Sequence, residues 1–400
     1  FWLEHKKLWR KKIVKICVLL CFVYCVIFGS ILSFQWFSFG SSDDYTSAFG
    51  NNFDGYTVIK DSQEYALSFG GELTDETLQQ IVSDYQQMEA DGMEKELEKT
   101  DWQIVNSWLG TLYPELRDTS NYKTMISYVD PDKLTGFYER RQQVLDEFLE
   151  ISGQVGAEKE FLHQMERKVE KPFHYEWVEG WSTLLGSMVA DLGVVMALFL
   201  GIVLSSLFAG EWHDNTSTLV LTTRNGWGKI ALAKILTGFA FTVELFALLA
   251  VSSVISQLFF MGTAGWNMPI QNIKLIAVAP MNMLQAEIYE YAFVLLGAIG
   301  FAGIVMFISA AVKNNVLTLL LSLAVVYGPM MIAEYLPYEM QKALDLIPLV
   351  GSSTDIFRTN TFRIFGKLIW SPYLLITIPV LIGILCMPFA IKSWSRRMKA

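Results

Sequence analysis

The sequence is poor in the residues that most often carry out chemistry. It holds four cysteines and four histidines in 400 residues, and the scattered histidines form no pair at a metal-binding spacing. The cysteines Cys17, Cys21, Cys25 and Cys386 all fall in apolar segments, so no disulfide framework is expected. The first three repeat every four residues and therefore share one helix face, where we interpret them as small packing residues.

A phosphate-binding loop is also lacking. The nearest candidate, NGWGKI at residues 225–230, does not have the Gly-x4-Gly-Lys-Ser/Thr spacing that cradles phosphates. No Ser/His/Asp or Cys/His arrangement stands out either, so we expect a non-catalytic chain that holds no cofactor of its own. A base-reading motif is likewise not found, which disfavours a nucleic-acid partner.

Charge is scarce as well. Only 18% of the residues are charged and 52% are hydrophobic, against a charged share of about 25% in soluble domains. A bilayer crossing needs about 20 mostly apolar residues. Six blocks meet that requirement, and they are Ile13–Ser33, Thr183–Phe208, Ile230–Leu258, Ile288–Val312, Val316–Ala333 and Tyr373–Ile391.

The positive charges predict the orientation of these spans. They gather at Lys6–Lys15, at Arg224 with Lys229, at Lys313 and at Lys392–Lys399. With six spans all four places fall on the same side of the membrane. Because Lys and Arg near span ends favour the cytoplasm, both termini are expected inside.

Two further segments are expected to lie at the membrane surface. The basic stretch Lys6–Lys15, with Trp2 and Trp9, indicates an interfacial helix attracted to anionic lipid. The amphiphilic segment Glu334–Pro372 is expected on the outer side as short interfacial helices, since Trp370 is typical of the aromatic belt.

The chain divides into three parts, residues 1–33, 34–180 and 181–400. The middle part holds 29 acidic and 12 basic residues, so it carries a net charge of −17 while the remainder carries +8. Its first portion is rich in Gly, Ser and Asn and indicates irregular structure. From Leu73 onward apolar residues follow helical spacing, with Thr74 as N-cap. We predict an all-α membrane protein with six transmembrane helices and a large, mostly helical extracytoplasmic domain between helices 1 and 2, acting as a spacer or docking module.

Two carboxylates within predicted spans are singled out. Asp191 lies in the second and Glu244 in the third, and at 1.5 Å per residue both reach the outer half at similar depth. An acid at membrane depth is a functional candidate, so the pair is expected to line one cavity. A purely structural role for each, by hydrogen bonding or protonation, is the alternative.

Small residues repeat every four positions along the second span. Such a stripe lets two helix backbones approach closely in lipid, and it marks this span as central in the bundle. The stripe consists of Gly193, Ala197, Gly201, Ser205 and Ala209, and the fourth span carries a similar cluster at Gly297–Gly303.

The connection between the second and third spans has an unusual pattern, LFAGEWHDNTSTLVLTTRNGWGKIALAKIL at Leu207–Leu236. This stretch resembles the first cytoplasmic connection of ABC-2 type transporter permeases. In that family an acid leaves the second span, a polar turn with Thr follows, and an apolar run, a basic residue and a span-opening Lys come next. The matching residues here are Glu211, Thr216, Leu219–Thr223, Arg224 and Lys234, with Asn215 where the family usually has Gly.

The resemblance implies a mechanism. Such permeases act as dimers, a copy or a paralogue pairing with this chain, and each half binds an ATPase subunit that supplies ATP and Mg. The segment 209–229 would then be the coupling loop, with a helix around Thr216–Lys229 seated on the ATPase. Arg224 and Lys229 could pair with its acids. A membrane-surface helix with snorkelling cations is the alternative for this segment.

Three functions are therefore open. The first is the permease subunit of an exporter that moves a peptide, a lipid or an amphiphilic drug outward. The second is a mechanotransmitting complex that moves its outer domain and transports nothing. The third is sodium extrusion, for which Asp191 and Glu244 are the only support.

Overall fold

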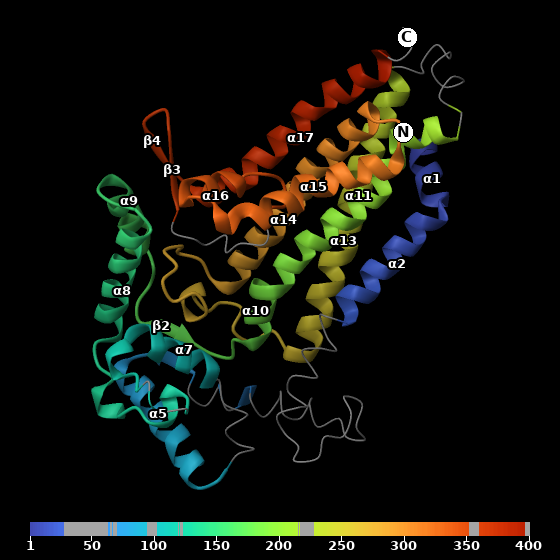
Figure 1. The fold of residues 1–400 in the computed structure, drawn as a ribbon. Helices are drawn as coiled ribbons and strands as arrows, with labels where there is room; N and C mark the ends of the chain where they lie inside the picture. Colours follow the sequence, from blue (N-terminus) through green and yellow to red (C-terminus); the bar gives the residue numbers. More distant parts are fainter. Residues whose placement is uncertain are drawn as a thin grey trace, which may run out of the picture.

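The structure, a computed structural model, is mostly helical and consists of a long-helix bundle with a smaller domain at one end (Figure 1). Residues 28–62, which hold the predicted irregular portion, lie outside the described part of the chain. So do most of the connection after the second span and the end of the chain. The described residues are 1–27, 63–64, 66, 70–93, 102–118, 120, 123–214, 216, 228–351 and 360–396.

Among the described residues, five helices are long and apolar enough to cross a membrane, which confirms the last five predicted blocks as long apolar helices. The helix α2, Lys12–Val26, covers the first two thirds of the remaining block, whose last six residues fall outside the described part of the chain. Its Cys17, Cys21 and Cys25 are buried and unbridged. The five long helices are α11 (Val189–His213), α13 (Lys229–Met261), α14 (Met283–Ala311), α15 (Asn315–Ile332) and α17 (Ser371–Arg396).

Helix α14 forms the centre of the bundle and contacts α11, α13, α15 and α17. It starts with a capping box in which Asn282 and Gln285 exchange side-chain and backbone hydrogen bonds. Glycines allow its closest approach to α17. A Cβ at Gly300 would lie 2.3 Å from the Pro379 carbonyl oxygen, and one at Gly303 would lie 2.6 Å from Gly383.

The predicted small-residue stripe of α11 is buried along its whole length. A Cβ at Gly201 would meet Leu319 and Leu323 of α15 at 3.2 Å. Nearer the end of α11, the Ser309 hydroxyl of α14 donates to the Ser205 carbonyl at 2.7 Å. The stripe therefore faces α14 and α15, and small side chains keep these three helices close.

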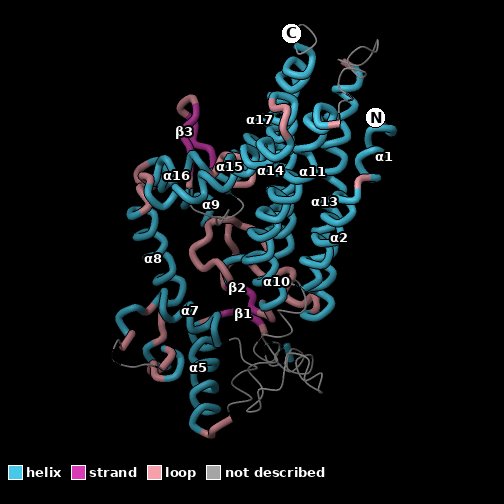
Figure 2. Tube along the Cα trace, turned by 45° about the vertical axis from the view of Figure 1, so that its right-hand side comes forward, coloured by secondary structure: helices cyan, strands magenta, loops and turns pink. Residues whose placement is uncertain are grey.

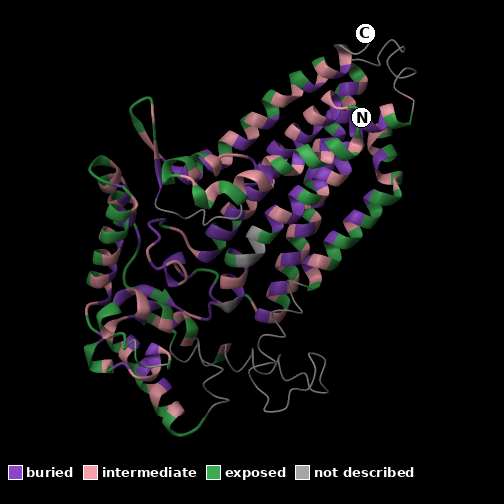
Figure 3. Ribbon diagram, viewed as in Figure 1, coloured by how far each residue is buried: buried purple, intermediate pink, exposed green. Residues whose placement is uncertain are grey.

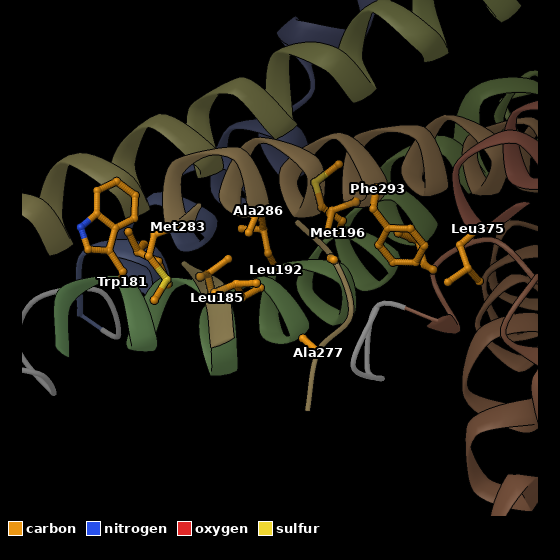
Figure 4. Close-up of a cluster of buried hydrophobic side chains, with 14 of the residues drawn as sticks. Trp181, Leu185, Leu192, Met196, Ala277, Met283, Ala286, Phe293 and Leu375 are labelled. Carbon is orange, nitrogen blue, oxygen red and sulfur yellow. The ribbon is translucent and has the colours of Figure 1, made fainter. Parts of the chain in front are cut away.

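A short lead-in joins the smaller domain to α11. It comprises α10 (Glu179–Thr183) and a π-helical turn, η5 (Leu184–Met188). Figure 4 shows Trp181 and Leu185 of this lead-in and Leu192 of α11 near Met283 and Ala286 of α14. Buried residues concentrate on these facing helix sides, while exposed residues mark the outer sides of the bundle (Figure 3).

We call the described residues between 70 and 178 the distal domain, because they lie at the end of the bundle opposite the termini (Figure 1). As predicted, helices dominate it, and Thr74 caps the first of the long ones by accepting from the Thr77 N–H. The helices are α5 (Asp75–Ala90), α7 (Trp102–Leu112), α8 (Phe137–Ile151) and α9 (Ala157–Glu166), with 3-10 turns at Pro114–Leu116, Met125–Ser127 and Pro131–Lys133.

A two-stranded antiparallel sheet brings the start and the end of the distal domain together. Strand β1 (Gly71–Leu73) pairs with β2 (Phe173–Tyr175) in a register that places Gly71 opposite Tyr175. Figure 2 shows this sheet between α10 and the helix α5. Buried Trp108 packs edge-on against Phe137 and Tyr175, so the aromatic core of the domain forms around β2.

The connection between α15 and α17 differs in part from the prediction. A short helix, α16 (Tyr338–Leu344), is present as expected. The hairpin of β3 (Thr361–Ile364) and β4 (Lys367–Trp370) was not predicted. Its two-residue turn has positive φ at both Phe365 (49°) and Gly366 (79°), the geometry that matches the twist of the two strands. The sequence does not signal this turn, because its first position holds Phe rather than the usual Asn, Asp or Gly.

Helix α1 (Trp2–Arg10) precedes α2 and packs on α13. Lys11 between them is extended, so the two helices are separate. Figure 1 shows α1 and the last turn of α17 at the same end of the bundle, which we call the termini end.

Candidate functional site

The two ends of the connection between α11 and α13 meet in an ion pair at the termini end. Lys234 Nζ lies 2.8 Å from Glu211 Oε1, and both side chains are buried, with 2% and 4% of their surface exposed. The same ammonium donates to the Leu207 carbonyl at 3.1 Å. Since a buried charge without a partner is costly, each of these residues stabilises the other.

The N-terminal helix completes this pair. Glu4 Oε2 lies 2.9 Å from Lys234 Nζ, and Lys7 Nζ lies 2.6 Å from Glu211 Oε1. Lys11 donates to Ser206 at 2.9 Å. We call the five residues Glu4, Lys7, Lys11, Glu211 and Lys234 the charge cluster. It joins α1, α11 and α13 through side chains rather than through the connecting backbone.

The cluster changes the titration of its two outer lysines. Burial alone would lower the pKa of Lys7, but the hydrogen bond and the charge of Glu211 outweigh it and raise that pKa above its ordinary value. Burial lowers the pKa of Lys11, and the positive charges of Lys234 and Lys7 lower it further. The two lysines differ because only Lys7 bonds directly to a carboxylate.

The other predicted coupling residues are placed only in part. Thr216 turns back on Glu211, with its N–H donating to the Glu211 carbonyl at 3.0 Å and its hydroxyl donating to the carboxylate. Lys229 is exposed at the start of α13. Arg224 and the run Leu219–Thr223 lie outside the described residues. The geometry thus separates a buried pair, which cannot touch another protein directly, from an exposed cation that can.

The intramembrane acids Asp191 and Glu244 do not share a site. Glu244 is 42% exposed and accepts from His5 and Trp9 of α1, each at 3.0 Å. Asp191 is also exposed and bonds to Tyr24, near the other end of α2. The expectation of one shared cavity was therefore wrong. The helical rise per residue gives the depth of each carboxylate along its own helix, but it does not show which neighbouring side chain the carboxylate contacts.

A second buried ion pair lies where the distal domain meets the bundle. Arg141 of α8 makes a two-pronged contact with Glu166 of α9, at 2.5 and 3.0 Å, and neither is more than 2% exposed. Its guanidinium also donates to the carbonyls of Leu275 and Ala277, at 2.6 and 3.1 Å. These two carbonyls belong to the segment 262–282 that joins α13 to α14.

Other contacts hold the same junction. The indole of Trp108 donates to the Asn272 carbonyl at 3.0 Å, and the amide of Asn272 donates to the His174 carbonyl at 2.6 Å. On the far side, Arg363 of the β3–β4 hairpin pairs with Glu158 of α9 at 2.5 Å. The distal domain is therefore attached both to the connection between α13 and α14 and to the connection between α15 and α17.

The sequence reasoning missed several of these residues. Glu4 carried a signal, since it is the only acidic residue before Asp43 in a strongly basic segment. Glu287 was missed because the fourth span was expected to begin at Ile288, whereas α14 begins at Met283 and takes in this acid. Glu290 lies within the expected span but was not singled out. Both are buried, with 5% and 4% of their surface exposed.

Comparison with known proteins adds no assignment: no family model matches the chain, and neither a curated protein nor a solved structure matches it.

Proposed function

We propose that this chain is the membrane-spanning subunit of an ATP-driven exporter of the ABC-2 type. A partner ATPase would hydrolyse ATP, and the chain would use that energy to move a peptide, a lipid or an amphiphilic drug outward. The proposal places both termini in the bacterial cytoplasm, the distal domain outside, and a second permease subunit beside this one.

The observation that carries the proposal is the buried contact between Glu211 and Lys234. In the resembling family these positions are the acid that leaves the second span and the Lys that opens the third. Here they pair at 2.8 Å and close the connection between α11 and α13 at its base. A push on that connection from an ATPase would therefore reach α11, α13 and α1 together. The exposed Lys229 and the predicted Arg224 are the residues proposed to touch the ATPase.

Mechanotransmission is the second candidate, and the junction at Arg141 favours it. The guanidinium links α8 and α9 to the segment that joins α13 to α14, so movement of those helices would move the distal domain. An exporter needs a path for cargo through the bundle, while a mechanotransmitter needs only this rigid attachment. Sodium extrusion loses its support, because Asp191 contacts Tyr24 of α2 whereas Glu244 contacts His5 of α1, so the two acids do not form one site.

The ATPase partnership is tested by purifying the tagged full chain from its native membranes and measuring ATP hydrolysis in the purified material. We expect the wild type to bring an ATPase with it. Arg224→Glu or Lys229→Glu should lower the co-purified activity several-fold without changing the thermal stability of the chain. A wild-type preparation without ATP hydrolysis would contradict the proposal.

The role of the buried pair is tested in the same assay. Glu211→Lys alone should uncouple or dissociate the ATPase, because it places two cations together in a buried site. The exchanged double variant Glu211→Lys/Lys234→Glu keeps one charge of each sign and should recover part of the activity. If the single variant hydrolyses ATP normally and responds normally to amphiphilic peptides, the pair has no part in coupling.

A further inference from the structure

The distal end of α14 holds an acidic side chain that nothing described in the structure neutralises. Glu287 stands in the second turn of α14 and exposes 5% of its surface. Neither of its carboxylate oxygens receives a hydrogen bond of normal geometry from the described residues. A bare carboxylate in such a place is strongly disfavoured, so the group must take up something positive.

The surroundings of Glu287 are polar but carry no cation. The Tyr291 hydroxyl, one turn further along α14, lies beside the carboxylate. That hydroxyl also shares a hydrogen bond of 2.9 Å with Ser253 of α13. Cys25 of α2 is the other titratable group beside Tyr291. Among the described residues, no Lys, Arg or His pairs with Glu287 or sits close enough to affect its charge.

Two other acids of the long helices, Glu211 and Glu244, are satisfied in ways that Glu287 is not, while the neighbouring Glu290 leaves one of its oxygens without a hydrogen bond. Glu211 has Lys234 and Lys7, and Glu244 has His5 and the Trp9 indole. These carboxylates can stay ionised because each meets a cation or an N–H donor. Glu287 has instead a hydroxyl that is already engaged with Ser253, which is a poor substitute for a positive charge.

We propose that Glu287 is a proton-binding site, in which one carboxylate oxygen takes a proton from water and the side chain becomes a neutral carboxylic acid. The O–H bond of that acid forms as an O–H bond of a hydronium ion in that water breaks and leaves a water molecule, and no other covalent bond changes. The Tyr291 hydroxyl, placed between Glu287 and Ser253, accepts from the neutral form and orients it. A metal cation fits less well, because such an ion needs several oxygen ligands and the neighbours seen here are one carboxylate and two hydroxyls. This proposal does not depend on a partner ATPase.

The test is infrared difference spectroscopy on the full chain in lipid nanodiscs across pH 5 to 9. Ordinary Asp and Glu side chains are ionised above about pH 6. A carbonyl band of a protonated carboxyl that persists at neutral pH therefore reports an unusual group. We expect this band in the wild type and its loss in Glu287→Gln. Glu244→Gln is the matched control on a partnered carboxylate and should keep the band.

Each alternative has its own outcome. The proposal is overturned if the wild type lacks the band at neutral pH or if the band survives in Glu287→Gln. Loss of the band in Glu290→Gln alone assigns the proton to the neighbouring acid instead. A band that disappears when NaCl replaces choline chloride at fixed pH identifies sodium as the ligand and also overturns it. Should Glu287→Gln fail to fold, Glu287→Asp keeps a carboxyl, and the band should shift in frequency rather than vanish.

Discussion

The two ends of the bundle treat buried charge in opposite ways. At the termini end, Glu211 and Lys234 are almost fully buried but satisfy each other, with Glu4 and Lys7 adding further contacts. At the distal end, Glu287 is equally buried and meets no cation among the described residues. Paired buried charges fix how helices pack against one another, whereas an unpaired buried carboxylate has to bind a proton or another cation. In our two proposals, the first end transmits movement and the second changes its protonation state.

The largest expected effect comes from breaking the pair at the termini end. Lys234→Met would leave Glu211 buried with only the half-exposed Lys7, and we expect a loss of about 3–5 kcal/mol in the free energy of unfolding. The measurement is denaturant-induced unfolding of the full chain in detergent. Replacing both partners, in Glu211→Leu/Lys234→Met, should restore most of that stability, because no charge then remains buried. A single variant as stable as the wild type would show that water reaches this pair.

The junction with the distal domain offers the next test. Arg141→Met would leave Glu166 with Lys171, 3.0 Å away, as its remaining cation, and it would free the carbonyls of Leu275 and Ala277. We expect a loss of about 3 kcal/mol and faster amide hydrogen exchange in the segment 262–282. The neighbouring, more exposed Arg140 is the control, and Arg140→Met should cost less than about 1 kcal/mol. Equal exchange rates in both variants would argue against a rigid junction.

A third prediction concerns the helix that connects the two ends. Gly300→Ala would push a methyl group against the Pro379 carbonyl of α17, so we expect a loss of about 1–3 kcal/mol from overpacking. Gly328 of α15 has open space at the same position, and Gly328→Ala should be neutral or slightly stabilising. Thermal unfolding of both variants in the same detergent separates a packing effect from a general effect of glycine replacement.

The smallest expected effect is a pH dependence in the distal domain. A hydrogen bond from its own backbone N–H, together with the hydrogen bond and the charge of Arg140, lowers the pKa of Glu115 below its ordinary value. A lowered folded-state pKa adds stability above about pH 4.5, and this contribution disappears as the pH falls through the folded-state value. Because the side chain is exposed, we expect less than about 1 kcal/mol. Glu115→Gln should flatten the loss of stability between pH 5 and 3, and an unchanged slope would contradict this.

The sequence alone determined the long helices and their type. Apolar runs of bilayer length are a local property, so five of the predicted spans were found, four of them with ends within five residues and the second with its start eight residues too early. The Thr74 N-cap and the helical spacing after it are local too, and both were confirmed. The hairpin after α16 was not predicted, because its turn carries Phe365 at a position where the usual turn residues would have signalled it. Only the backbone geometry reveals this turn.

The tertiary structure decided which charges meet. Glu211 and Lys234 were both singled out from the sequence, but their mutual burial, and the part that Glu4 plays, depend on how α1, α11 and α13 are rotated about their axes. The same rotations separated Asp191 from Glu244 and placed Glu287 against Tyr291. Hydropathy fixes where a helix lies along the chain. The direction in which a given side chain points is set only by packing against its neighbours, and that packing involves residues hundreds of positions apart.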